Sequence, residues 1–252
     1  MTNILAIDTS TPACSVAIRW GGETLTRHKL ASREHTKLLL PMVDELLSEV
    51  YIGLSQIDVI AFTAGPGSFT GIRIGFGVVQ GLAFGADLPV LPVSTLETLA
   101  YTATRKLCLE SDASVQIIPM LDARMDEIYW AQFQIPKAPE VPGNQESLLL
   151  ERVCEDHLSA PEQVLPIMND ASTSSNASVI VAVGDGWNYC DRLTFKATNT
   201  DPMLLPEAQD ILAIAEPLIG TEKVISIDEA SPIYLRDKIT WKKRERLRER
   251  LE

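Results

Sequence analysis

One pattern of strands and turns occurs twice along this chain of 252 residues, and it constrains the fold more than any other feature. In its first copy, the apolar run 4–7 ends at Asp8, turns, and returns as a second apolar run from Cys14. A later apolar run, 59–63, leads into a Gly-Pro-Gly turn at 65–67. A hairpin with an aspartate at its bend is thus followed by a strand that ends in a glycine turn.

The second copy begins with the apolar run 117–121, which ends at Asp122 and returns as 128–133. A later apolar run, 179–183, leads into a Gly-Asp-Gly turn at 184–186. The interval from the aspartate to the first glycine is 57 residues in the first copy and 62 in the second. Repetition of a whole supersecondary unit predicts a duplicated α/β architecture rather than a single sheet.

Apolar periodicity around these runs predicts helices at 33–50, 70–85 and 204–219. The proline-rich stretch 136–147 and the polar stretch 169–178 are predicted to be exposed loops, to which no role is assigned. The expected domains are a first lobe of residues 1–104 with about 204–235, a second lobe of residues 105–203, and a basic C-terminal tail at 236–252.

The charge is acidic overall and unevenly distributed. The chain has 22 basic and 34 acidic residues, which gives a formal net charge of −12. Because nucleic-acid affinity depends on Lys and Arg that neutralise phosphates, this balance argues against a chain that holds RNA by itself. The tail 236–252 carries +4 and the preceding 235 residues carry −16. That basic segment is either a solvated terminal helix or a contact for RNA or an acidic partner.

Three absences predict where the protein resides. The four cysteines are far apart and form no C-x-x-C pair, so they are interpreted as reduced thiols of an intracellular protein. The N-terminal residues lack a basic region followed by a long apolar run, so no secretory signal is expected. The nearest candidate for a membrane span, 69–86, contains Arg73 and Gln80. A cytoplasmic protein without a membrane anchor is therefore predicted.

Two short segments are candidates for phosphate binding. The first is the glycine turn before the second helix, with Gly65, Gly67, Ser68 and Thr70. Its free backbone N–H groups would favour an anion. The second is the hairpin bend with Asp8, Thr9 and Ser10, whose oxygens could hold hydrated Mg²⁺. Each segment can equally be a structural turn, and neither matches a P-loop or a full G-x-G-x-x-G motif.

Metal-dependent and hydrolytic chemistry find little support in the sequence. The three histidines, His28, His35 and His157, form no i, i+4 pair and no cluster with cysteine. No Ser-His-Asp order and no G-x-S-x-G elbow is present. No metal site and no catalytic residue are therefore predicted, and His35 is expected to pack or hydrogen-bond locally at the start of its helix.

The helices at 33–50 and 70–85 are more apolar than a surface helix requires. In the first, apolar residues cover more than one stripe, and the second contains five glycines at about i, i+4 spacing. Each interior glycine costs roughly 1 kcal/mol against alanine, so the repetition indicates a surface for close approach, either to the chain's own core or to another subunit. We favour a partner surface. The predicted interface residues are Arg33, His35, Leu39, Val43, Leu46, Gly71, Arg73, Gly75 and Gly81.

Seven segments of the chain together carry a family resemblance. They are Ile4–Ser10, Arg33–Thr36, Leu40–Val43, Gly65–Gly75, Val93–Leu96, Leu121–Arg124 and Tyr234–Arg236. As a set, they closely resemble the bacterial TsaB (YeaZ) family of the TsaD-like superfamily. The resemblance implies an actin-like ATPase fold, of the Hsp70 and sugar-kinase type, with two duplicated lobes, in agreement with the internal repeat.

The resemblance also implies a role in forming N6-threonylcarbamoyladenosine in tRNAs that read ANN codons. In that pathway TsaD transfers the threonylcarbamoyl group, and TsaB is its non-catalytic partner, joined by the ATPase TsaE. The implied partners are TsaD and TsaE, with tRNA contacted indirectly through the complex. Whether the chain forms a homodimer when TsaD is absent stays open. No cofactor of its own is implied, and whether ATP or ADP binds at the interface of the complex stays open.

One departure from the TsaD pattern supports the non-catalytic assignment. TsaD-like proteins follow a Pro-Val strand end with His-x-x-x-His, a metal-binding pair on one helix face. In this chain Thr95 and Leu99 occupy the matching positions, and neither side chain can replace an imidazole. Two other functions are weighed against the partner subunit. They are an autonomous ATPase or kinase that uses Asp8 and residues 65–71, and a metallopeptidase-like protein, which the missing histidines disfavour.

Overall fold

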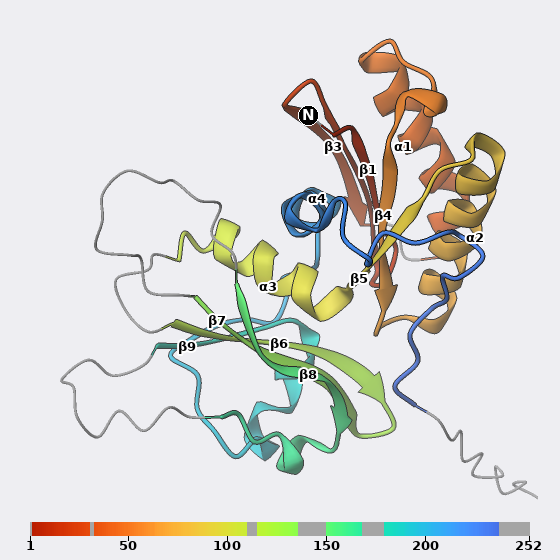
Figure 1. Ribbon diagram of the computed structural model, residues 1–252. Coiled ribbons are helices and arrows are strands. Elements are labelled where there is room, and N and C mark those ends of the chain that lie inside the picture. The colour runs from red at the N-terminus through yellow and green to blue at the C-terminus, as the bar shows by residue number, and fades with distance from the viewer. Residues whose placement is uncertain (1, 31–32, 110–114, 136–149, 168–178, 237–252) are drawn as a thin grey trace, which may run out of the picture.

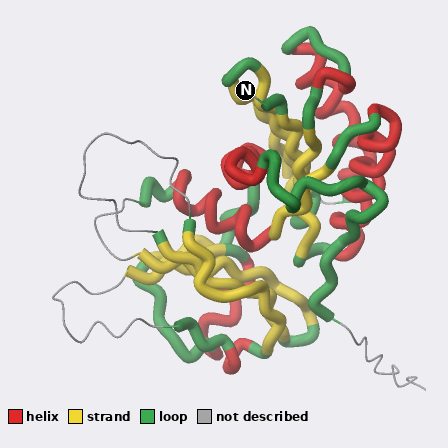
Figure 2. Tube along the Cα trace, in the orientation of Figure 1, coloured by secondary structure: helices red, strands yellow, loops and turns green. Residues whose placement is uncertain are grey.

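The computed structural model describes residues 2–30, 33–109, 115–135, 150–167 and 179–236 (Figure 1). Within these ranges the chain forms two five-stranded sheets with helices beside and between them, which Figure 2 shows as two groups of yellow strands. The predicted loops at 136–147 and 169–178, and all of the basic tail beyond Arg236, lie outside the described residues.

The first sheet has the order β3-β2-β1-β4-β5. Its strands are β1 (Ile4–Asp8), β2 (Ala13–Trp20), β3 (Glu23–Leu30), β4 (Val59–Gly65) and β5 (Val90–Ser94). The first three form an antiparallel meander, and β4 and β5 add to the other side of β1 in parallel. The bend that follows β1 and the turn that follows β4 therefore lie at the same edge of the sheet.

The second sheet repeats this order with later strands, as β8-β7-β6-β9-β10. Its strands are β6 (Val115–Arg124), β7 (Glu127–Gln134), β8 (Glu151–Ser159), β9 (Val179–Val183) and β10 (Asn199–Asp201). The directions also repeat, because β6 is antiparallel to β7 and parallel to β9. The predicted duplication is confirmed, and the chain has an actin-like α/β fold of two lobes.

The main helices connect or cover these strands. They are α1 (His35–Glu49), α2 (Phe69–Ala86), α3 (Thr95–Lys106) and α4 (Ala208–Ala215). Short 3-10 helices occur at Leu54–Gln56, Pro161–Gln163, Asp185–Arg192 and Glu216–Leu218. Ser68 caps α2 by accepting a hydrogen bond from the Gly71 N–H. The helix predicted at 204–219 is shorter, because Pro206 lies before its start and a 3-10 turn replaces its last part.

Alternating side chains give the first sheet two apolar faces. Leu5 and Ile7 of β1 point toward α1 and α2, whereas Ile4 and Ala6 pack against α4. Figure 1 shows α1 and α2 on one side of this sheet and α4 on the other. A sheet covered on both faces reads as a continuous apolar run, which explains the short, unbroken runs of β1 and β4 in the sequence.

The second sheet is covered mainly by α3. Leu96, Leu99, Ala100 and Ala103 of this helix are fully buried in the core with side chains of β6, β7 and β9. The lobe boundary predicted near residue 104 lies within α3, which packs its buried leucines and alanines in the second lobe and Tyr101 also against the first-lobe cluster.

Among the described residues, α2 is the one helix that is long and apolar enough to cross a membrane by length and composition. Its mean hydropathy over 18 residues is 1.2. Ile72, Val79 and Ala83 on its inner face are buried against the first lobe, so the apolar character is partly that of a core helix. Phe76, Val78 and Leu82 are partly buried against the same core, whereas Phe69 and Phe84 are exposed.

Candidate functional site

The carboxylate of Asp8 lies at the carboxyl end of β1 and is completely buried. Its Oδ1 accepts hydrogen bonds from Ser10 Oγ at 2.6 Å, Thr63 Oγ1 at 2.6 Å and Ser10 N at 3.1 Å. Its Oδ2 is buried without a hydrogen-bond partner. Burial raises the pKa of Asp8 against the opposing effect of these hydrogen bonds. The site therefore holds a carboxylate at a cost in stability.

The two predicted phosphate segments meet at this end of the sheet and pack directly on each other. Ser68 N donates to the carbonyl oxygen of Ser10 at 2.7 Å, and Thr9 Oγ1 donates to the carbonyl oxygen of Gly71 at 2.8 Å. A Cβ added to Gly67 would overlap Ser10, and one added to Gly71 would overlap the Thr9 carbonyl oxygen. Because glycine has no Cβ, the two loops can pack directly on each other at these positions. This close packing within the chain is enough to explain why glycine occurs there.

The other residues of the predicted phosphate-binding turn differ in their exposure to solvent. Gly65 is buried beside the loop contact, whereas Thr70 faces solvent on the first turn of α2. Gly75 belongs with Gly71, because a Cβ there would overlap Thr9 Oγ1. The threonine side chain thus fills the groove that the two glycines leave on the inner face of α2.

His35 behaves as its local interpretation predicts. Its ring is 6% exposed, and Nε2 lies 3.0 Å from the Thr11 carbonyl oxygen and 3.1 Å from that of Ala13. With two acceptors facing it, Nε2 carries the proton and donates. The side chain therefore pins the start of α1 to the bend after β1.

Several of the predicted interface side chains lie in the core instead. Leu39 and Leu46 are 0% exposed and Val43 is 3% exposed, and all three pack against the first sheet. With His35, Gly71 and Gly75 also buried, these side chains cannot line the surface of the chain, contrary to the prediction. Their i, i+4, i+7 spacing is that of a core stripe. Arg33, Arg73 and Gly81 are exposed as the prediction requires.

The outward face of α2 carries three glycines beside an exposed phenylalanine, with the polar Arg73 and Gln80 at its border. A Cβ added to Gly77, Gly81 or Gly85 would meet nothing within 4 Å. Phe84 on the same face is 81% exposed, and Leu40 of the adjoining α1 is 49% exposed. Nothing within the described parts of the chain explains why glycine occupies these three positions.

Arg73 lies at the beginning of this outward face. Its guanidinium carbon is 3.7 Å from the centre of the Phe69 ring, and its Nε donates to Tyr234 Oη at 2.9 Å. The Tyr234 ring packs at 5.6 Å from that of Phe69. A residue from near the C-terminal end of the described chain therefore supports the first turn of α2.

The second lobe has a counterpart of the Asp8 site. Asp122, near the end of β6, donates its backbone N–H to Asp185 Oδ1 at 2.8 Å. A Cβ on Gly184 would overlap the Met120 carbonyl oxygen, so the glycine turn again packs closely on the strand before it. Burial raises the pKa of Asp185. The pairing of an aspartate bend with a glycine turn is thus repeated in space as well as in sequence.

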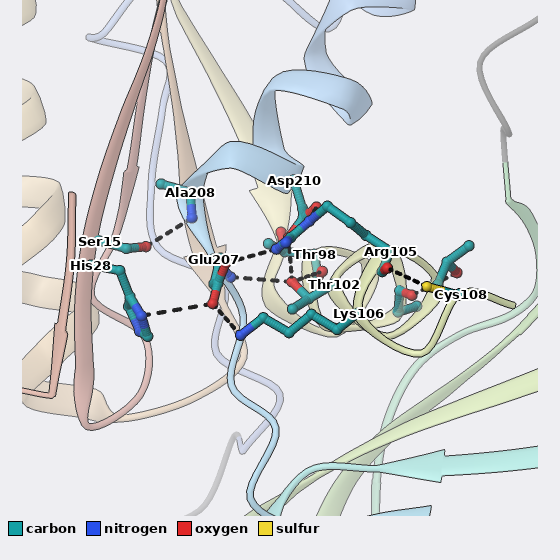
Figure 3. Close-up of polar contacts among 12 residues, drawn as sticks. Ser15, His28, Thr98, Thr102, Arg105, Lys106, Cys108, Glu207, Ala208 and Asp210 are labelled. Atoms are coloured by element: carbon teal, nitrogen blue, oxygen red, sulfur yellow. Dashed lines mark hydrogen bonds and ion pairs between the residues drawn. The ribbon is translucent and has the colours of Figure 1, made fainter. Parts of the chain in front are cut away.

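Figure 3 shows the polar junction that joins the lobes where α3 meets α4. Arg105 Nε donates to Asp210 Oδ1 at 2.7 Å, and its Nη2 donates to Asp210 Oδ2 at 2.8 Å and to Glu207 at 2.7 Å. Thr102 Oγ1 donates to Asp210 Oδ2 at 2.7 Å, and Lys106 forms an ion pair with Glu207. Asp210 is 4% exposed, so its charge depends on these partners.

The electrostatics of the junction follow from this geometry. The hydrogen bond to Asp210 raises the pKa of Arg105. Burial alone would raise the pKa of Glu207, but the hydrogen bonds from Lys106 and Arg105 lower it overall. Both groups are therefore held in their charged forms, which fixes α4 against α3.

The sequence did not indicate Thr63, the partners Arg105 and Asp210, or the contact of Tyr234 with Arg73. Thr63 could have been found, because it is the one polar residue of the apolar run 59–63 that leads into the glycine turn. The Arg105–Asp210 pair spans 105 residues and belongs to no periodic pattern, so only the packing of the lobes reveals it.

The two positions that replace the metal-binding histidines are inside the protein. Thr95 and Leu99 are both 0% exposed, and Leu99 belongs to the apolar core of the second lobe. A Cβ on Gly184 would lie 2.9 Å from Leu99 Cδ2, so the leucine fills the space beside that turn. Within the described ranges, no three His, Cys, Asp or Glu side chains are grouped to hold a metal ion.

The duplicated sheets and their paired aspartate bends define a two-lobed actin-like α/β protein. A protein named "tRNA threonylcarbamoyladenosine biosynthesis protein TsaB" from Haemophilus influenzae is 41% identical over 95% of this chain and 96% of its own length. The Escherichia coli protein of the same name is 39% identical over 95% of this chain and 97% of its own length. A solved structure described as YeaZ from Pseudomonas aeruginosa has 36% identity and a TM-score of 0.81, and it covers 93% of this chain and 100% of its own.

The chain belongs to the TsaB family, and its resemblance to that family is confirmed. The family described as TsaD, tRNA N6-adenosine threonylcarbamoyltransferase, matches residues 26–146. The predicted pathway, the biosynthesis of threonylcarbamoyladenosine in tRNA, is therefore confirmed by the names of the relatives.

Proposed function

We propose that this chain is the non-catalytic partner subunit of a TsaD-type threonylcarbamoyltransferase, in a complex that also contains the ATPase TsaE. The complex would form N6-threonylcarbamoyladenosine in tRNAs that read ANN codons, with tRNA contacted through TsaD. The observation that carries the proposal is the outward face of α2, where Gly77, Gly81 and Gly85 adjoin the exposed Phe84.

The glycines of α2 have two separate explanations. Gly71 and Gly75 are required by Thr9 on the inner face, whereas the outward three have open space around them. Each interior helical glycine costs roughly 1 kcal/mol against alanine, so three unexplained ones indicate a need outside the chain. A glycine stripe beside an exposed phenylalanine suits the close approach of another helix, since backbones can meet where Cβ atoms are missing.

The absence of catalysis is supported by two features of the site. Leu99 and Thr95 stand where TsaD-like proteins place metal ligands, and both are buried in the chain's own core. The Asp8 carboxylate is completely buried beneath loops that contact each other through Thr9 and Ser10. We expect the isolated chain to bind little or no ATP, and any ATP or ADP to bind at the interface of the complex.

Size-exclusion chromatography with TsaD tests the proposed surface. Gly81→Leu keeps the face apolar and improves helix propensity, but adds bulk to the stripe. We expect this variant to be at least as stable as the wild type and to lose co-elution with TsaD. Phe84→Glu should also lose co-elution, because it places a charge in an apolar contact.

Met203→Glu is the matched control, because Met203 is 82% exposed and lies in the second lobe. It should leave the complex intact. A complex that forms equally well with Gly81→Leu and Phe84→Glu would refute the proposed surface. The same face is expected to pair with a second copy when TsaD is absent, so the two α2 variants should also remove any concentration-dependent dimer.

A further inference from the structure

The last described part of the chain crosses from the first lobe to the second. Ile225 pairs with Val90 of β5 through two backbone hydrogen bonds of 2.9 Å, and Ile233 N donates to the Ala64 carbonyl oxygen at 2.8 Å. The Ile233 carbonyl oxygen lies so near Gly65 that a Cβ there would be 2.6 Å away. In Figure 1 this blue segment passes α2 and then descends toward the second sheet.

Tyr234 attaches the segment to α2. Its hydroxyl accepts a hydrogen bond from Arg73 at 2.9 Å, and its ring packs against Phe69. Arg73 is stacked on Phe69 at the same time, so three side chains from two segments form one cluster. Such cation–aromatic contacts are stabilising even at exposed sites.

Arg236 attaches the segment to the second lobe. Its Nη2 donates to the Arg124 carbonyl oxygen at 3.3 Å and to the carboxylate of Glu127, and its Nη1 lies 3.2 Å from Met125 Sδ. The Arg236 side chain is only 19% exposed. All three partners belong to the turn between β6 and β7.

That turn is strained. Arg124, Met125 and Asp126 have φ of 64°, 58° and 63°, in the left-handed region that side chains other than glycine disfavour. A two-residue hairpin with positive φ at both central positions is preferred by Asn-Gly, and here the residues are Met-Asp. Such a conformation persists only where surrounding contacts hold it. Within its own lobe, the turn is also held by Arg192, which pairs with Asp126 at 3.3 Å on the surface.

We propose that residues 231–236 form a latch that joins the glycine turn after β4 to the strained β6–β7 turn and thereby fixes the two lobes on the side opposite the α3–α4 junction. Tyr234 is the first-lobe anchor of the latch and Arg236 its second-lobe anchor. Because Arg73 lies on α2, the latch also couples the outward face of that helix to the second lobe. The inference is independent of the proposed partner.

Amide hydrogen exchange of the full chain tests the latch. Arg236→Ala should raise exchange rates in residues 120–130 about tenfold, as expected for the loss of a hydrogen bond to a charged group. Tyr234→Ala, although it alters only the first-lobe anchor, should raise exchange in the same second-lobe turn. Arg236 substitutions should in turn raise exchange of the Ile233 N–H, because coupling between two anchors is reciprocal.

The matched control is Arg27→Ala. Arg27, like Arg236, forms an ion pair with a glutamate, but its two partners, Glu45 and Glu49, join β3 to α1 within the first lobe. It should leave residues 120–130 unchanged. Arg236→Lys keeps the charge and loses the planar fork, so it provides a milder variant should Arg236→Ala fail to fold.

Replacing Met125 and Asp126 by Asn-Gly gives the turn its preferred sequence and should make its exchange insensitive to Arg236→Ala. Unchanged exchange at residues 120–130 in both Arg236 variants would overturn the latch. A Tyr234→Ala effect confined to α2 would overturn it as well, since the two anchors would then be separate contacts.

Discussion

The two lobes place an aspartate at the same position of the same sheet, but surround it differently. In the first lobe, Asp8 is 0% exposed, with three hydrogen bonds on one oxygen and none on the other. In the second lobe, the Asp122 side chain is 20% exposed. It accepts hydrogen bonds from Arg124 N at 2.8 Å and from Tyr189 Oη at 3.3 Å.

The difference lies in what covers each bend. A full helix, α2, presses its first turns onto the bend after β1 through Gly71 and Gly75. The short 3-10 helix Asp185–Arg192 follows the matching turn in the second lobe and leaves Asp122 partly in water. Duplication therefore fixes the position of the carboxylate, whereas the covering element decides its solvation.

The largest effect is expected from filling the close contacts of the two glycine turns. Gly71→Ala should lower the free energy of unfolding by roughly 3 kcal/mol, because its Cβ would overlap the backbone oxygen of Thr9. Gly184→Ala should cost a similar amount, since a Cβ there would overlap the Met120 carbonyl oxygen and φ is +91°. Urea denaturation of both variants measures whether the lobes are equally tight at these turns.

Gly81→Ala controls for helix propensity alone. Its Cβ has open space, so the free energy of unfolding should rise by up to about 1 kcal/mol. If Gly71→Ala were as harmless as Gly81→Ala, the close packing of the first bend would be contradicted.

The sequence predicts some features of the two aspartate bends and not others. The duplication was predictable, because an aspartate bend and a glycine turn recur at similar intervals. The division of the α2 glycines into packed and open positions was not predictable. At 100° per residue the five glycines lie at about 40° steps on one arc of about 160°, and Gly85 is as near to Gly71 as to Gly81. The contacts of Gly71 and Gly75 with Thr9 separate these two glycines from the rest.

Other parts could not be predicted from local pattern. The packing of α3 with the second lobe and the Arg105–Asp210 pair depend on how two sheets meet, which no periodicity records. The complete burial of Asp8 depends on the fit of Thr9 between two glycines of α2. A single aspartate in a turn is compatible with either burial or exposure, so the solvation of this carboxylate required the structure.

The second-largest loss of stability is expected at the junction between the lobes, and it tests whether the aspartate bend of one lobe depends on contact with the other lobe. Asp210→Ala removes the buried carboxylate that Arg105 and Thr102 bind. It should lower the free energy of unfolding by roughly 2 kcal/mol, less than for a fully buried pair, because Arg105 is partly exposed and keeps Glu207. Thermal and urea denaturation measure this loss.

Glu216→Ala is the matched control for the junction. Glu216 forms an exposed ion pair with Arg19, so its removal should change the free energy of unfolding by no more than about 0.5 kcal/mol. Equal losses from Asp210→Ala and Glu216→Ala would show that the junction contributes no more than a surface pair. Faster amide exchange around Asp8 in Asp210→Ala would show that the first bend depends on the other lobe.

The smallest effect separates the two aspartates themselves. Burial raises the folded-state pKa of Asp8 above its unfolded value of 3.8, so the folded protein binds this proton more tightly. The stability that the proton contributes is fully present below pH 3.8 and is lost as the pH rises through the folded-state pKa. Asp8→Asn removes the buried ionisable group and should raise the free energy of unfolding at pH 7 by an amount on the order of 1 kcal/mol.

The gain from Asp8→Asn should shrink as the pH falls through the folded-state pKa and disappear below pH 3.8, where the wild-type carboxyl becomes neutral in both states. Asp122→Asn should stay within about 0.5 kcal/mol of the wild type, because that side chain is partly solvated and its pair with Arg124 is exposed. Urea denaturation at pH 7 and pH 4 distinguishes the two. Stabilisation by both substitutions, or by neither, would mean that the helix over the first bend does not set the solvation of its carboxylate.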